Sequence, residues 1–215
     1  ASLLAYAARQ GASPFELWIV ALLTLLPVSE LAISLLNAVL TWQIPPGQLP
    51  KLALRGGIPA SDRTIVLVPS IVDSEARLDA LLHDLVVRFL ANRDPHLHFA
   101  LLSDFADAPQ QSMPGDEALL QLARERIDAL NGAHGPDRFL FLHRERRWNA
   151  RDQQWMGWER KRGKLDEFNR LLRGATDTSF VVIHGDATVL PGIKYVITLD
   201  SDTQLPLEAA RRLVG

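Results

Sequence analysis

The sequence predicts an α/β domain that follows a long apolar helix. Three observations lead to this prediction. From Arg63 onward, short continuous apolar runs alternate with helical stretches, which is typical of a parallel sheet covered on both faces. Residues 15–42 are almost free of charged side chains. A stretch rich in proline and glycine separates these two parts of the chain.

The composition of the 215 residues is that of a folded protein. Hydrophobic residues make up 47% and charged residues 22%, which argues against disorder. The formal net charge of -2 gives no field that would attract nucleic acid, so we expect no nucleic-acid partner. The chain contains no cysteine, which excludes disulfides and thiolate metal sites.

The apolar segment Phe15–Trp42 has the length and composition of a transmembrane helix. Its only ionisable residues are Glu16 and Glu30. As a helix it would extend over roughly 40 Å, more than the ~30 Å core of a bilayer. We therefore expect residues 1–43 to contact membrane lipid. The alternative is a buried helix of a soluble protein, against which the missing polar face argues.

Residues 44–62 are predicted to form a linker without regular structure. Their run IPPGQLPKLALRGGIP contains four prolines and three glycines. Basic residues are more frequent after the apolar segment than before it. Because basic residues favour the inner side of a membrane, we expect residues 63–215 to lie in the cytoplasm.

The region 63–215 divides into predicted strands and helices. Each strand is a short run of apolar or β-branched residues, and each helix has apolar residues three or four positions apart. Ser74 is suited to begin a helix, and Gly174 to end one. The predicted strands are 64–70, 98–104, 139–143, 179–186 and 195–199, and the predicted helices are 74–91, 116–131, 164–173 and 206–214.

Carboxylates follow two of the predicted strands. Asp104 ends the second strand, and Asp200 and Asp202 follow the last one in YVITLDSDTQLP. The carboxyl ends of parallel strands meet at one edge of the sheet, where α/β proteins bind ligands. Residues two apart in an extended chain point the same way, so Asp200 and Asp202 can hold Mg²⁺ or Mn²⁺ bound to a diphosphate. Alternatively, Asp202 caps the following helix and Asp200 is a solvated loop residue.

The run WMGWERKRGKLDEFNRLL is locally basic. Residues 141–173 contain ten Lys or Arg and five Asp or Glu. Gly163 and Lys164 are predicted where a loop enters a helix, a position suited to binding a phosphate, although a solvated basic face is the alternative. The nearby Trp148, Trp155 and Trp158 either stack on a sugar or base or pack in the core.

Several of these segments resemble the glycosyltransferase domain of the bacterial cyclic β-1,2-glucan synthases. The similar stretches are LANRDPHLHFALLSDFADAP, FLHRERRWN, WMGWERKRGKLDEFNRLLRG and YVITLDSDTQLP. The run LLPVSELAISLLN also resembles the membrane segment that precedes that domain. The resemblance extends from about Leu26 to Gly215 and implies a partial GT-A-like, Rossmann-related nucleotide-sugar domain over residues 63–215.

The resemblance implies an enzyme of the bacterial inner membrane. Its glycosyltransferase domain would transfer glucose from UDP-glucose, with inversion, to a growing β-1,2-glucan chain on the cytoplasmic side. The implied donor-site residues are Pro69 in the nucleotide-binding loop, Asp104 at the uridine, Lys164 and Asn169 near the base or diphosphate, and Asp200 and Asp202 at Mg²⁺ or Mn²⁺ and the donor.

The general base and the acceptor-binding element of the family come well after the two aspartates. We therefore expect them beyond Gly215, and expect this chain to be a fragment that holds the donor half of the site without turnover of its own. Two alternatives remain open. One is a non-catalytic, membrane-anchored scaffold or interaction module, and the other is a polyprenyl-phosphate or other processive polysaccharide glycosyltransferase.

Overall fold

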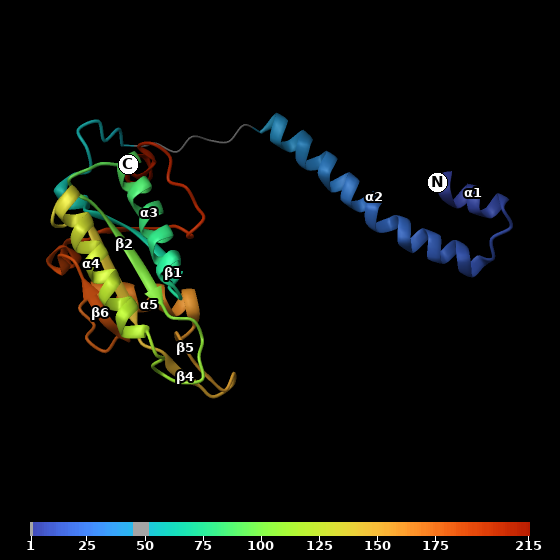
Figure 1. Ribbon diagram of the computed structural model, residues 1–215. Helices are drawn as coiled ribbons and strands as arrows, with labels where there is room; N and C mark the ends of the chain where they lie inside the picture. Colours follow the sequence, from blue (N-terminus) through green and yellow to red (C-terminus); the bar gives the residue numbers. More distant parts are fainter. Residues whose placement is uncertain (1, 45–51) are drawn as a thin grey trace. The chain divides into compact units, whose positions relative to one another are not determined.

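The chain divides into two units, residues 1–50 and 51–215 (Figure 1). The computed structural model describes residues 2–44 and 52–215. Much of the predicted linker, residues 45–51, lies outside the described residues. In the remainder of that linker Ile58 is buried, and Ala60–Asp62 form a short 3₁₀ helix, η1, directly before the first strand.

The first unit consists of two helices, α1 (Ser2–Arg9) and α2 (Pro14–Gln43). Helix α2 begins with a capping box, in which Ser13 and Glu16 each accept from the other's backbone N–H. None of the residues of α2 is buried. Within the described residues, α2 is the one helix that is long and apolar enough to cross a membrane, as the sequence predicts.

The second unit is built on a five-stranded sheet with the strand order β6-β3-β2-β1-β7. Strands β1, β2, β3 and β7 are parallel, which confirms the predicted α/β class. The register pairs Ile71 with Asp104 and Asp104 with Arg144, so the three central strands end side by side. The bounds are β1 (Thr64–Ile71), β2 (Leu97–Asp104), β3 (Phe139–Arg144), β6 (Phe180–His184) and β7 (Tyr195–Thr198).

Strand β6 departs from the predicted parallel arrangement, because it runs antiparallel to β3 at the edge of the sheet. The chain re-enters the sheet beside the carboxyl end of β3, where Glu145 donates its backbone N–H to the carbonyl of Ser179. A strand that starts at this end must run back toward the amino end. An apolar run indicates a strand but not its direction, so the sequence did not reveal this reversal.

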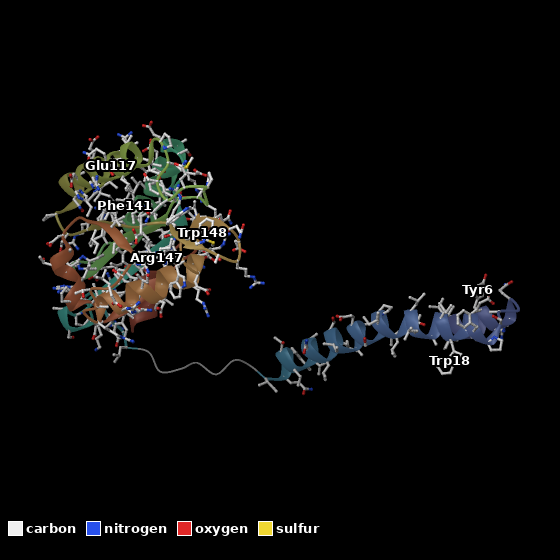
Figure 2. The ribbon with its side chains drawn as sticks, turned by 90° about the horizontal axis from the view of Figure 1, so that it is seen from below. Tyr6, Trp18, Glu117, Phe141, Arg147 and Trp148 are labelled. Atoms are coloured by element: carbon white, nitrogen blue, oxygen red, sulfur yellow. The ribbon has the colours of Figure 1, made fainter. Side chains whose placement is uncertain are left out.

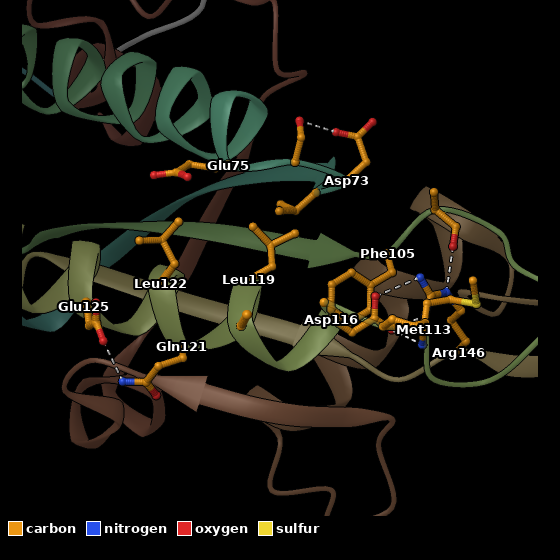
Figure 3. Close-up of a pocket in the computed structure, with 16 residues that line it drawn as sticks. Asp73, Glu75, Phe105, Met113, Asp116, Leu119, Gln121, Leu122, Glu125 and Arg146 are labelled. Atoms are coloured by element: carbon orange, nitrogen blue, oxygen red, sulfur yellow. Dashed lines mark hydrogen bonds and ion pairs between the residues drawn. The ribbon is translucent and has the colours of Figure 1, made fainter.

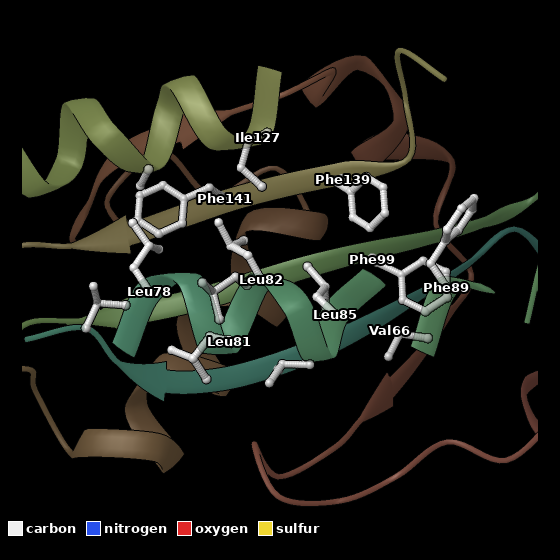
Figure 4. Close-up of a cluster of buried hydrophobic side chains, with 14 of the residues drawn as sticks. Val66, Leu78, Leu81, Leu82, Leu85, Phe89, Phe99, Ile127, Phe139 and Phe141 are labelled. Carbon is white, nitrogen blue, oxygen red and sulfur yellow. The ribbon is translucent and has the colours of Figure 1, made fainter. Parts of the chain in front are cut away.

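Helices cover both faces of the sheet. Helices α3 (Glu75–Ala91) and α4 (Asp116–His134) pack on one face, where Phe89, Phe99 and Phe139 meet with ring centroids 5.2–6.3 Å apart (Figure 4). Helix α5 (Arg160–Leu172) packs on the other face through Phe168. Each such buried side chain stabilises the fold by roughly 1.5–3 kcal/mol.

Four smaller elements complete the unit. The hairpin β4 (Arg147–Asn149) and β5 (Gln154–Met156) was not predicted, because three-residue strands carry no apolar run. The 3₁₀ helix η2 (Ala187–Gly192) precedes β7, and α6 (Ala209–Val214) follows it. Helix α5 begins earlier than predicted, so Gly163 and Lys164 lie inside it and not where the loop enters it.

Candidate functional site

A cleft of about 300 Å³ opens at the carboxyl ends of β1 and β2. It brings together three of the residues that the sequence singled out, Pro69, Asp104 and Lys164. Ser201, which lies between the two aspartates of the Asp-Ser-Asp sequence, also lines it. The cleft therefore lies where parallel α/β folds place their ligands. The other lining residues are Ser70, Ile71, Arg77, Phe105, Asp107, Gly157, Arg160 and Lys161.

Asp104 is fixed at the floor of this cleft by two cations. Arg144 donates to both carboxylate oxygens through Nε and Nη2, each at 2.8 Å, and Lys164 Nζ lies 3.1 Å away. Arg144 also contacts Glu167 Oε2 at 3.4 Å. All four side chains are buried, and such charges are tolerated in a protein interior only when they are paired and hydrogen-bonded. The network thus fixes the position of Asp104.

Lys164 gives the cleft a cation whose pKa is shifted by burial and by the neighbouring charges. Its ammonium donates to the backbone carbonyl of Ser70, at the end of β1. Burial lowers the pKa of Lys164 to about 8; the neighbouring Asp104 carboxylate raises it and the Arg144 guanidinium lowers it further. At neutral pH the ammonium remains largely charged and can attract an anion entering the cleft.

Asp200 and Asp202 lie on the exposed turn that follows β7, closed by a hydrogen bond from the Thr203 N–H to the Asp200 carbonyl. Asp200 forms an ion pair with Lys161. Asp202 makes no salt bridge within the described part of the chain. It does not cap the following helix either, because α6 begins only at Ala209.

The described residues contain no group of three or more His, Asp or Glu side chains placed to hold a metal ion. Two exposed carboxylates two residues apart nevertheless fit the oxygen chemistry of Mg²⁺ or Mn²⁺. They can supply part of a coordination shell, which diphosphate oxygens and water would have to complete. Asp200 and Asp202 are therefore the residues that would hold such an ion together with its ligand.

A buried arginine positions the loop that carries these aspartates. Arg88, in the last turn of α3, donates to the Ser201 carbonyl at 2.7 Å and to the Thr203 carbonyl at 2.9 and 3.0 Å. Asn92 continues this support by donating to the carbonyls of Leu205 and Pro206. The loop is thus held through its backbone, and its two carboxylates lie at exposed positions.

We expect Arg88→Met to loosen this loop. The variant keeps most of the buried volume but loses the hydrogen bonds to two carbonyls, which are worth about 1 kcal/mol net and correspond to about fivefold more frequent local opening. Hydrogen exchange of the backbone amides in 200–206 measures this change. Arg93→Met, at an exposed position of the same region, serves as the control and should leave exchange in that loop unchanged.

Asn169 is not brought to this cleft. It lies on an exposed position of α5, whereas Lys164 on the same helix is buried against β1 and β2. The structure also adds cationic residues that sequence reasoning missed, namely Arg77, Arg144, Arg160 and Lys161. The signal for Arg144 was its place at the end of an apolar strand, where a charged residue must find a partner.

A second, larger cavity of about 730 Å³ lies between the first turns of α3 and α4 (Figure 3). None of the candidate site residues that the sequence predicted lines it. Its guanidinium, Arg146, already pairs with Asp116 at 2.5 Å and stacks over the Phe105 ring at 4.6 Å. Because Arg146, the one cation among the described residues that line this cavity, is already paired, the smaller cleft beside Asp104 is the better candidate site.

Comparison with known proteins supports the resemblance described above. The sequence matches no protein-family model. It is 44% identical over 200 residues to the cyclic β-(1,2)-glucan synthase NdvB of Rhizobium meliloti (strain 1021). The match covers 92% of this chain, and the chain spans 7% of the length of that protein. The chain is therefore homologous to a segment of a cyclic β-(1,2)-glucan synthase, which confirms the resemblance seen in its motifs.

Proposed function

We propose that residues 52–215 form the donor-binding part of a glycosyltransferase that uses UDP-glucose to build a β-1,2-glucan. One observation carries this proposal: in a chain homologous to a glucan synthase, the carboxyl edge of the sheet holds a cleft with a fixed carboxylate, Asp104, beside several cations. A nucleoside diphosphate needs both, because its base offers N–H donors and its phosphates are anionic.

Each side of the cleft has a part in this proposal. Asp104 accepts a hydrogen bond from the uracil ring while Arg144 holds it in place. Lys164 neutralises charge near the base and diphosphate. Pro69 lies within β1, and not in a loop after it as the resemblance implied, and it lines the cleft from the end of that strand. Asp200 and Asp202 hold Mg²⁺ or Mn²⁺, which when bound would neutralise the charge of the departing UDP.

The proposal also places the protein at a membrane. Helix α2 would anchor the chain in the bacterial inner membrane, with its apolar side chains in contact with lipid. The excess of basic residues after this helix supports a cytoplasmic location for the second unit. There it would meet UDP-glucose and a growing glucan chain.

The test is a calorimetric titration of the full chain in detergent with UDP-glucose, with and without Mn²⁺. We expect Asp202→Asn to weaken the Mn²⁺-dependent binding about tenfold or more, because an amide is a poorer ligand for a hard cation. Asp177→Asn removes the same charge at an exposed position outside the cleft and should bind normally. If the unaltered chain binds no UDP-glucose in either condition, a scaffold role replaces this proposal.

A further inference from the structure

A third pocket, of about 570 Å³, adjoins the proposed donor cleft. It lies between the hairpin β4–β5 and the turn that leads into α5. Arg160 lines both this pocket and the donor cleft, so the two are neighbours. The volume falls in the range of ~300–1,000 Å³ that is usual for ligand sites.

The pocket is lined by tryptophans that the protein core does not use. Trp148 is 52% exposed and Trp158 is 44% exposed. Trp148 lies on the outside of the unit beside Arg147 (Figure 2), and Trp155 supports it from the side with ring centroids 5.9 Å apart. Of the two roles predicted for these tryptophans, stacking on a ligand is favoured over core packing for Trp148 and Trp158, because both residues are exposed to solvent.

Polar side chains surround these rings. Arg151 makes no salt bridge within the described residues, and Asn149 and Asp152 lie at the same end of the pocket. A site of flat aromatic faces with polar groups around them suits a ligand with apolar faces and hydroxyl edges. A pyranose ring has this form, with C–H groups on its faces and hydroxyls around its rim.

The pocket is held in shape from the buried side. Glu159 and Arg160 adopt left-handed backbone conformations, with φ of 50° and 48°, which are unfavourable for residues other than glycine. Arg144 stabilises this turn by donating to the Trp158 and Arg160 carbonyls, each at 3.1 Å. The hairpin is joined to the unit by paired backbone hydrogen bonds between Ala108 and Trp155, each 2.9 Å long. Such fixed geometry is expected of a binding site and not of a loose surface loop.

We propose that this pocket binds the growing glucan, as a run of β-1,2-linked glucose residues stacked on Trp148 and Trp158 beside the donor cleft. The identity of the sugar rests on the proposed function, whereas the location rests on the tryptophans and the pocket. The pocket holds part of the acceptor chain, in addition to the acceptor-binding element expected beyond Gly215, and thereby keeps the reacting end near the bound UDP-glucose.

The test uses the full chain with ¹⁵N-labelled tryptophan in a detergent that has no sugar headgroup. Its five tryptophans give five indole N–H signals, of which those of Trp18 and Trp42 report on the apolar helix. On titration with a linear β-1,2-gluco-oligosaccharide we expect saturable shifts at Trp148 and Trp158 and none at Trp18 and Trp42. A linear α-1,4-gluco-oligosaccharide should bind more weakly.

Trp148→Ala is the decisive variant, because Trp158 also packs against α5 beside Gly163. We expect it to weaken oligosaccharide binding about fivefold to tenfold, the effect of one lost stacking contact. Trp42→Ala is the matched control and should change nothing.

Three results would overturn the assignment: no saturable shift in a sample that binds UDP-glucose, unchanged affinity in Trp148→Ala, or equal binding of the α-linked sugar. Oligosaccharide shifts in a sample that fails to bind UDP-glucose would instead contradict the proposed function and leave the pocket assigned.

Discussion

Replacing Arg144 with methionine is expected to destabilise the α/β unit by about 3–5 kcal/mol. Methionine fills much of the same space, but it leaves the buried carboxylates of Asp104 and Glu167 without their shared cation. Trp158 and Arg160 also lose the donor that satisfies their carbonyls. The free energy of unfolding, from urea titration followed by circular dichroism, measures the loss.

Arg147→Met provides the matched control for this experiment. Arg147 lies three residues further along the chain, and its 3.4 Å ion pair with Glu145 is exposed to solvent. Exposed pairs contribute only about 0–1 kcal/mol, so we expect a small change. Equal losses in Arg144→Met and Arg147→Met would show that the buried network does not stabilise the fold in the way described.

Adding one methyl group at Gly157 is expected to disrupt the proposed donor cleft. A Cβ at this position would lie 2.5 Å from Asp104 Oδ2 and 3.0 Å from Arg144 Nη2. No rotamer change of a flexible side chain relieves this clash, because both groups are fixed by each other and buried. We expect Gly157→Ala to cost about 1–3 kcal/mol of stability and to weaken UDP-glucose binding about tenfold or more, since Asp104 must move.

Gly132→Ala makes the same chemical change at a position where the added methyl meets nothing within 4 Å. Gly132 lies within α4, where alanine is favoured over glycine by about 0.5–1 kcal/mol. The two variants should therefore change the free energy of unfolding in opposite directions. Thermal unfolding and UDP-glucose titration of both variants check this, and normal donor binding by Gly157→Ala would remove Asp104 from the donor site.

Much of the fold could be predicted from the sequence because its signals are local. The apolar runs that became β1, β2 and β3 are buried on both faces and bounded by polar residues. The direction of β6 could not be predicted, because it depends on where the chain re-enters the sheet. The hairpin β4–β5 was missed because its three-residue strands carry no apolar run, and its bridge to Ala108 is distant in the sequence.

The candidate site was predictable only in part. Asp104 and the Asp200–Asp202 pair were singled out because carboxylates after apolar strands are conspicuous, and of these only Asp104 lines the cleft. Arg144 and Arg88 were not, because their importance comes from partners far away in the chain. A helical register alone could not show that Asn169 is exposed while Lys164 is buried.

The guanidinium of Arg144 contacts both the proposed donor cleft and the turn beside the proposed saccharide pocket. It donates to the Asp104 carboxylate, which would bind the nucleotide, and to the backbone carbonyl of Trp158, whose side chain would bind the saccharide. If a ligand bound in one of these two sites shifts the Arg144 guanidinium, the affinity of the other site for its ligand changes. Such thermodynamic linkage is reciprocal, so UDP-glucose should change the affinity for oligosaccharide by the same factor as oligosaccharide changes that for UDP-glucose.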